Sequence, residues 1–140
     1  MNKLVEIALK EYGTRAVQGE NSNPEVIKYF HGTGFDWVKN DDTPWCAAFL
    51  NWILKEAGIA GTNSLLARSF LAFGEHVEVP EIGDIVVLWR VAKESIYGHA
   101  GLFIRESGNS LFLLSGNQDE EVKIKAYPKW QLLDIRRVNI

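Results

Sequence analysis

The sequence lacks the features that would place it in several large classes of protein. It has a single cysteine, which excludes an internal disulfide and any zinc site built from several cysteines. It has 15 Lys and Arg against 18 Asp and Glu, so the formal charge is −3, whereas a nucleic-acid-binding face normally needs a basic patch. No apolar run approaches the roughly 18 residues of a membrane-spanning helix. We therefore expect no nucleic-acid partner and no membrane span.

The N-terminal residues also lack the continuous apolar stretch of a secretory signal, because Glu6, Lys10 and Glu11 interrupt it. We therefore expect synthesis in the cytoplasm, with action at the cell wall or in the periplasm only after non-classical export or lysis. There is no internal repeat, and no Pro/Gly/Ser-rich linker divides the chain. With 140 residues, 46% of them hydrophobic, the chain is predicted to form one domain over residues 1–140.

The apolar spacing changes from helical to strand-like between the two halves of this domain. Residues 1 to about 75 predict helices, with Asn23 and Thr43 as N-caps and Pro24 and Pro44 as first helical residues. A fourth, shorter helix is expected within residues 63–74. Residues 80 to 140 predict consecutive antiparallel strands at 83–90, 99–106, 110–117, 122–127 and 132–138. This order predicts an α+β fold in which N-terminal helices pack on a C-terminal sheet of five or six strands.

The single cysteine, Cys46, stands where a helix is predicted to begin. With Thr43 as N-cap it is the third helical residue, where the helix dipole and unpaired backbone N–H groups favour a thiolate. The same N–H groups suit a developing oxyanion. The alternative is that Cys46 is a small buried hydrophobic residue, because its helix is strongly apolar.

Three histidines are candidates for the base that a cysteine nucleophile needs. His31 is placed at a predicted helix end and His76 in a solvated connection, so both are expected to have structural roles. His99 differs because it begins a predicted strand and is followed by the small residues Ala100 and Gly101, which leave room for another group to approach. We therefore take His99 as the candidate base.

The hairpin after His99 predicts a third residue for the site. A three-residue loop at 107–109 places Asn117 opposite His99, on the same face of the sheet. A two-residue turn at Gly108-Asn109 places Gln118 there instead. Either amide can orient the imidazole, as the third member of a cysteine-histidine-amide triad does.

These residues resemble a known family. The segments PWCAAF, GDIVVLWR, GHAGLF and LLSGNQ, in that order over nearly the whole chain, resemble the papain-like cell-wall hydrolases of the CHAP and NlpC/P60 superfamily, above all its small single-domain members from phages and bacteria. The resemblance implies that Cys46 is the nucleophile, His99 the base and Asn117 (with Gln118 as the alternate) the orienting residue. The chain departs from the CHAP pattern at Ser115, where many members have an acidic residue.

The resemblance further implies a peptidoglycan hydrolase that cuts an amide bond of the stem peptide, and we favour an endopeptidase slightly over an N-acetylmuramoyl-L-alanine amidase. A papain-like protease or deamidase toxin that acts on a protein is one alternative. A catalytically inactive binding domain, with Cys46 in the core, is another. The expected partners are the stem peptides themselves, and a holin-type or immunity protein is a further candidate.

Candidate substrate-binding residues are Trp37 and Asp42, in the loop before the cysteine, and Trp45 next to it. For Trp45 the alternative is core packing, because Trp45 and Trp52 are seven residues apart in one predicted helix. No cofactor and no metal site are expected. Calcium, which some relatives bind, has no Asp-rich loop to hold it here.

Overall fold

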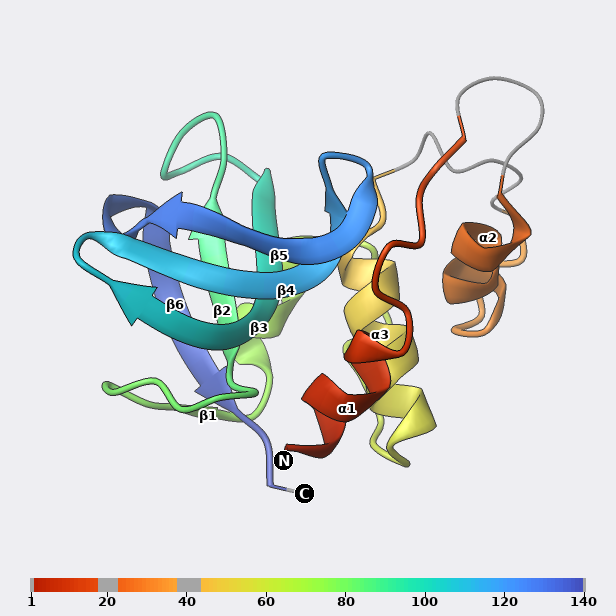
Figure 1. Cartoon of the computed structure of the whole chain (residues 1–140), viewed down its shortest axis with the longest axis horizontal. Coiled ribbons are helices and arrows are strands. Elements are labelled where there is room, and N and C mark those ends of the chain that lie inside the picture. The colour runs from red at the N-terminus through yellow and green to blue at the C-terminus, as the bar shows by residue number, and fades with distance from the viewer. Residues whose placement is uncertain (1, 18–22, 38–43, 140) are drawn as a thin grey trace.

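Helices come first and strands follow, in the order that the sequence predicts (Figure 1). The computed structural model describes residues 2–17, 23–37 and 44–139. Its helices are α1 (Lys3–Leu9), α2 (Pro24–His31), α3 (Cys46–Glu56) and the 3-10 helices η1 (Ala67–Ala72) and η2 (Lys129–Gln131). Its strands are β1 (Glu75–His76), β2 (Ile85–Trp89), β3 (Gly98–Ser107), β4 (Ser110–Gln118), β5 (Glu121–Pro128) and β6 (Leu132–Arg137). The predicted α+β class is confirmed.

The strands form one antiparallel sheet in the order β1-β6-β2-β3-β4-β5. The C-terminal strand β6 therefore lies between β1 and β2, and the expectation that consecutive strands are neighbours is wrong at that point. Ile135 of β6 is buried with Val86 and Leu88 of β2 in an apolar cluster separate from the one that contains α3. This burial favours the pairing of β6 with β2. The short strand β1, which the sequence did not predict, pairs with the end of β6.

The N-terminus of α2 is as predicted, and that of α3 is not. The Asn23 side chain accepts a hydrogen bond from the Glu25 N–H at 2.9 Å, and Pro24 is the first residue of α2. In α3 the first helical residue is Cys46, because Trp45 has a non-helical backbone (φ −127°). The predicted N-cap Thr43 lies outside the described residues. Cys46 is therefore the first rather than the third residue of its helix, still within the turn whose N–H groups lack helical acceptors.

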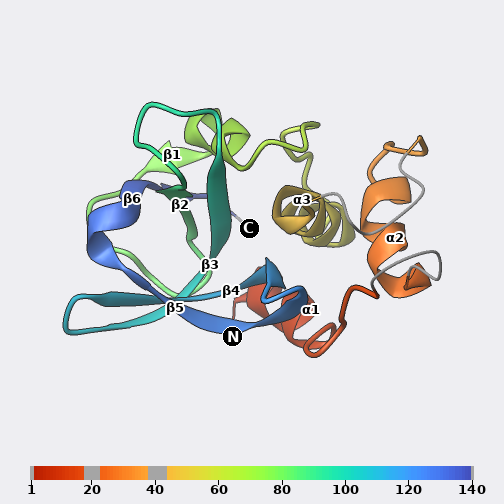
Figure 2. The ribbon, with the colours of Figure 1, turned by 90° about the horizontal axis from the view of Figure 1, so that it is seen from above.

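The start of α3 is packed tightly against the sheet. Trp45 is fully buried, and its ring lies where a side chain on Gly116 of β4 would be: a Cβ there would come within 2.6 Å of the indole. On its other side Trp45 stacks on Tyr29 of α2, with ring centroids 5.8 Å apart. Figure 2 shows α3 between the curved sheet and α2. This packing sets the position of Cys46 relative to β3 and β4.

The remaining predicted helix is shorter than expected. Residues 67–72 form the 3-10 helix η1 within the predicted span 63–74. Among the residues that the structure describes, none of the helices is long and apolar enough to cross a membrane.

Candidate active site

The candidate base, His99, is the second residue of β3 and is buried. It lies directly opposite Leu88 of β2, so it is held in the middle of the sheet rather than at an edge. Gly98 before it has no side chain, and a Cβ there would lie 2.8 Å from the Leu88 carbonyl oxygen. The glycine thus allows the close pairing of strands that sets the position of the imidazole.

The register of the hairpin decides which amide reaches His99. The turn is the two-residue Gly108-Asn109, with Ser107 opposite Ser110. A bulge at Ile104 then restores the register predicted for the longer loop, so that Phe103 faces Leu113. Further along, Asn117 adopts a left-handed backbone (φ 56°) where the pairing of β4 with β5 is again irregular. This second irregularity turns the side chain of Gln118, not that of Asn117, toward His99.

Gln118 makes a defined contact with the imidazole. Its Oε1 lies 2.9 Å from His99 Nε2, and both residues are buried. Its side-chain NH2 donates to the carbonyl oxygens of Leu113 at 3.0 Å and Lys123 at 2.5 Å. Since both amide hydrogens are used in this way, Oε1 is the atom that faces His99, and it can only accept. Nε2 of His99 therefore carries a proton, and Nδ1 is the ring nitrogen left for Cys46.

Tyr127 of β5 also belongs to this series of hydrogen-bonded side chains, and the sequence analysis did not identify it. Its hydroxyl donates to the same Gln118 Oε1 at 3.1 Å, and its ring centroid lies 5.1 Å from that of His99. Burial, together with the nearby Cys46 thiolate, raises the pKa of Tyr127 well above its usual value, so the hydroxyl stays protonated and remains a donor. The only sequence signal for it is its alternation with Lys123 and Lys125 along β5.

Cys46 is hydrogen-bonded to His99 and lies against two backbone N–H groups, those of Ala47 and Ala100. Burial alone raises the pKa of a thiol. Here the charge and hydrogen bond of His99, with the two N–H groups, outweigh the burial, so the pKa of Cys46 is lowered. A lowered thiol pKa beside a histidine is the environment of a reactive rather than a structural cysteine.

Ser115, the position where the CHAP pattern has an acidic residue, supports this arrangement from beneath. It is fully buried, and its hydroxyl donates to the Ala100 carbonyl oxygen at 2.7 Å. The bond holds the segment of β3 whose N–H group faces the thiol. The Ser115 hydroxyl thus bonds to the backbone, and the hydrogen-bond partner of the imidazole is Gln118 instead of residue 115.

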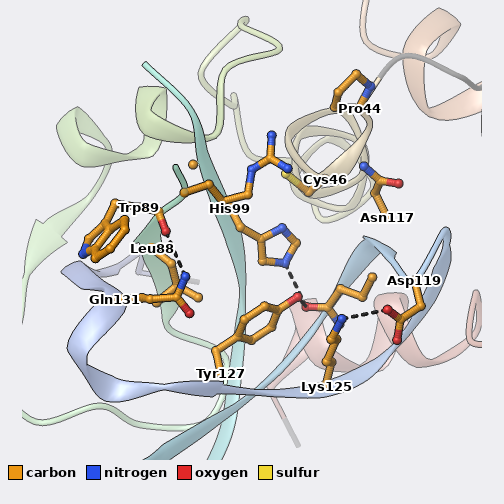
Figure 3. Close-up of a pocket in the computed structure, with 13 residues that line it drawn as sticks. Pro44, Cys46, Leu88, Trp89, His99, Asn117, Asp119, Lys125, Tyr127 and Gln131 are labelled. Carbon is orange, nitrogen blue, oxygen red and sulfur yellow. Dashed lines mark hydrogen bonds and ion pairs between the residues drawn. The ribbon is translucent and has the colours of Figure 1, made fainter. Parts of the chain in front are cut away.

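The thiol and the imidazole open into a cleft of about 360 Å³ (Figure 3). Around it stand Trp89, Asn117, Asp119, Lys125, Tyr127 and Gln131. Asp119 pairs with Lys125 at 2.7 Å and with Lys123 at 2.6 Å, and these hydrogen bonds lower the pKa of Asp119 to about 2. The end of the cleft beside His99 is therefore polar and carries fixed charges of both signs.

The predicted substrate-binding residues are distributed differently. Trp45 is completely buried and does not line the cleft, so its assignment to substrate binding is wrong and the core alternative holds. Trp37 is 66% exposed and packs edge-on against Phe35, apart from the residues that line the cleft. Asp42 lies outside the described residues. Asn117 lines the cleft, but the amide hydrogen-bonded to His99 is that of Gln118. The aromatic side chains that line the cleft are Trp89 and Tyr127.

Metal ligands are not gathered anywhere in the described part of the chain. No group of three or more His, Cys, Asp or Glu residues within 2–17, 23–37 and 44–139 is arranged to hold an ion. The reacting groups described above are one thiol, one imidazole and one side-chain amide.

The fold has a counterpart among solved structures. A structure described as similar to lipoprotein, NLP/P60 family, from Staphylococcus aureus subsp. aureus Mu50 matches 97% of this chain with a TM-score of 0.53. The sequence identity is 18%, and the chain spans 40% of the length of that protein. At this identity the likeness shows that the two proteins share an α+β fold, and no more. No protein-family model matches the chain, and no curated protein sequence matches it at a significant level.

Proposed function

We propose that the protein is a cysteine hydrolase that cleaves an amide bond of peptidoglycan stem peptides. The observation that carries the proposal is the continuous contact of Cys46, His99 and Gln118 at the wall of an open cleft. A thiol of lowered pKa, a base with one nitrogen free for it and a neutral residue that fixes the tautomer are the parts that amide cleavage by cysteine needs.

The reaction follows from these positions. The Cys46 thiolate attacks the amide carbonyl carbon, and the negative charge moves to the oxygen. The backbone N–H of Cys46, at the first position of α3, has no helical acceptor and can donate to that oxygen. His99, which took the thiol proton of Cys46 on Nδ1 when the thiolate formed, gives that proton to the leaving amine as the C–N bond breaks. Water, deprotonated by His99, then attacks the thioester and releases the acid and the thiolate.

The choice of substrate rests on the family resemblance of the sequence and on the charges of the cleft. Stem peptides carry free carboxylates and amino groups close to their amide bonds. Lys125, Asp119 and Arg90 line the cleft and offer partners of both signs. Action at the cell wall, and the holin-type or immunity protein as partner, stay predictions from the sequence.

The test compares the wild type, Cys46→Ala and His76→Ala on purified sacculi, with released fragments identified by mass spectrometry. His76, in β1, does not line the cleft and serves as the control. We expect the wild type and His76→Ala to release fragments with new amino groups and Cys46→Ala to release none. The fragment masses identify the bond and separate endopeptidase from amidase. Equal release from all three proteins, or none from the wild type, contradicts the proposal.

A further inference from the structure

A second hollow adjoins the cleft at Cys46. Its volume is about 230 Å³, and its own walls are Leu65, Leu66, Ala67, Ile96 and Tyr97. It meets the cleft at residues that line both spaces: Pro44, Cys46, Arg90 and Gly98. The thiol therefore stands at the junction of two spaces of opposite character, one polar and one apolar.

The apolar hollow keeps large hydrophobic side chains exposed beside the thiol. Leu66 is 53% exposed, Ile96 66% and Tyr97 52%. Exposed apolar groups that gather at one concave place are typical of a binding surface rather than of ordinary protein surface. A ligand group seated between them would remove this apolar area from water.

The outer wall of the hollow is held by the Ser95 hydroxyl within its own loop, and Arg68 fastens that loop to the rest of the protein. Ile96 and Tyr97 belong to the loop between β2 and β3, and Arg68 of η1 donates to three carbonyl oxygens of that loop. Its Nε reaches Tyr97 at 2.8 Å, its Nη1 reaches Lys93 at 2.9 Å and its Nη2 reaches Ala92 at 3.1 Å. The guanidinium, with its fixed fork of donors, thus fastens the loop to the segment that supplies Leu66 and Ala67.

The two spaces correspond to the two sides of the bond to be cut. His99 must reach the leaving amine in order to protonate it, and His99 lines the polar cleft but not the hollow. The amine portion of a substrate therefore occupies the polar cleft. The acyl portion, which stays on the Cys46 sulfur as the thioester, then extends into the hollow, which Cys46 also lines.

We propose that this hollow is the acyl-side subsite, that it takes an apolar side chain of the substrate, and that Arg68 is a residue that positions its wall. The inference rests on the proposed function only for the assignment of the hollow to the acyl side. It names the substrate class more narrowly: amides with an apolar acyl portion and a polar or charged amine portion. Among stem-peptide amides, a lactyl or alanyl carbonyl fits this rule, and a glutamyl carbonyl beside a carboxylate does not.

Peptide aldehydes test the subsite without requiring turnover, because the Cys46 sulfur adds reversibly to the aldehyde carbon and the thiol proton moves to the oxygen. We would measure how N-acetyl-glycinal and N-acetyl-leucinal protect Cys46 from alkylation, and compare N-acetyl-glycyl-glycinal with N-acetyl-leucyl-glycinal in the same way. We expect at least one leucyl compound to bind about tenfold tighter than its glycyl counterpart.

Variants then test which side chains cause the preference for leucyl over glycyl compounds. Leu66→Ala and Ile96→Ala should reduce the leucyl preference to less than about threefold. Val91→Ala is the matched control, because Val91 is an exposed apolar residue of the same loop that does not line the hollow. Arg68→Lys should weaken leucyl binding and leave glycyl binding unchanged. Equal binding of both compounds in each pair, or a preference that survives Leu66→Ala and Ile96→Ala, overturns the proposal.

A second measurement separates failure of the subsite from failure of the proposed function. In the Cys46→Ala protein, N-acetyl-leucine amide should shift the NMR signals of Leu66 and Ile96, and N-acetyl-glycine amide should not. If the aldehydes fail to protect Cys46 but these shifts occur, the hydrolase proposal is contradicted, and the hollow is still supported as a binding site for an apolar side chain. If the shifts are absent, the proposal of an apolar subsite is contradicted, whether or not the protein is active on sacculi.

Discussion

Two histidines of the same sheet stand in opposite surroundings. His99, in β3, is buried among neutral groups and contacts Gln118 and the Cys46 thiol. His76, in β1, is half exposed and lies between two carboxylates, with Nδ1 2.5 Å from Asp134 and Nε2 2.7 Å from Glu78. The hydrogen bonds to Glu78 and Asp134 raise the pKa of His76.

The difference teaches what makes a histidine a base. Both ring nitrogens of His76 are committed to carboxylates, which favour the protonated imidazolium and leave no lone pair for another group. His99 has one nitrogen fixed by a neutral acceptor, so the other is free to exchange a proton with the thiol. Neutral partners around His99 and charged partners around His76 thus distinguish the candidate catalytic histidine from the structural one.

The largest expected effect comes from removing each histidine in turn. His99→Ala should lower kcat on sacculi by about 10² to 10⁴, because the proton donor to the leaving amine is lost. It should also slow alkylation of Cys46 near neutral pH, since the thiolate loses its partner. His76→Ala should change neither rate by more than about twofold. A large loss of activity in His76→Ala, in a protein that is still folded by circular dichroism, would contradict the distinction.

The next effect concerns the residue that orients His99. Gln118→Ala should lower kcat by about tenfold to a hundredfold, less than loss of the base itself, and should move the pH midpoint of Cys46 alkylation. The matched control is Asn117→Gly, since glycine readily adopts the left-handed backbone found there. The control should keep most of the activity and the alkylation profile. If Asn117→Gly loses as much as Gln118→Ala, the hydrogen bond to Gln118 is not what orients the imidazole.

Much of the fold was predictable because local sequence patterns determine it. Asn23-Pro24 determines the start of α2, and turn signals separate the strands of the second half. The position of β6 between β1 and β2 was not predictable in the same way, because it depends on the burial of Ile135 against distant residues. The start of α3 shows a similar limit: Trp45, buried against Gly116, has a non-helical backbone, and the helix begins two residues after Pro44.

The residues of the candidate site also differ in how far local sequence predicts them. Cys46 and His99 stand out in the sequence through residue type and neighbours, and the structure brings them together. Gln118 was the prediction for a two-residue turn, yet it reaches His99 through the combined effect of that turn, a bulge at Ile104 and the left-handed Asn117. Such irregularities have weak sequence signals. Tyr127 and Arg68 act through contacts between distant segments, which no local pattern reveals.

A smaller effect is expected from the Tyr127 hydroxyl, which bonds to the neutral partner of His99. Tyr127→Phe removes one hydrogen bond to Gln118 Oε1 and keeps the ring beside the imidazole. The loss of one neutral hydrogen bond predicts a decrease of about fivefold in kcat with KM unchanged. Tyr12→Phe is the control, because Tyr12 is exposed and its hydroxyl accepts from the Ile124 N–H outside the cleft. An unchanged kcat in Tyr127→Phe would show that Gln118 is held by its two carbonyl partners alone.

The smallest effect tests the charged surroundings of His76. Folding raises the pKa of this residue above the unfolded value of 6.5, so its ion pairs stabilise the folded state fully below that pH. The contribution is lost as the pH rises through the folded pKa. We expect the melting temperature of the wild type to exceed that of His76→Gln slightly at about pH 5, and the difference to vanish at about pH 9. A difference that grows with pH would mean that His76 is held neutral, and the contrast with His99 would then not rest on charge.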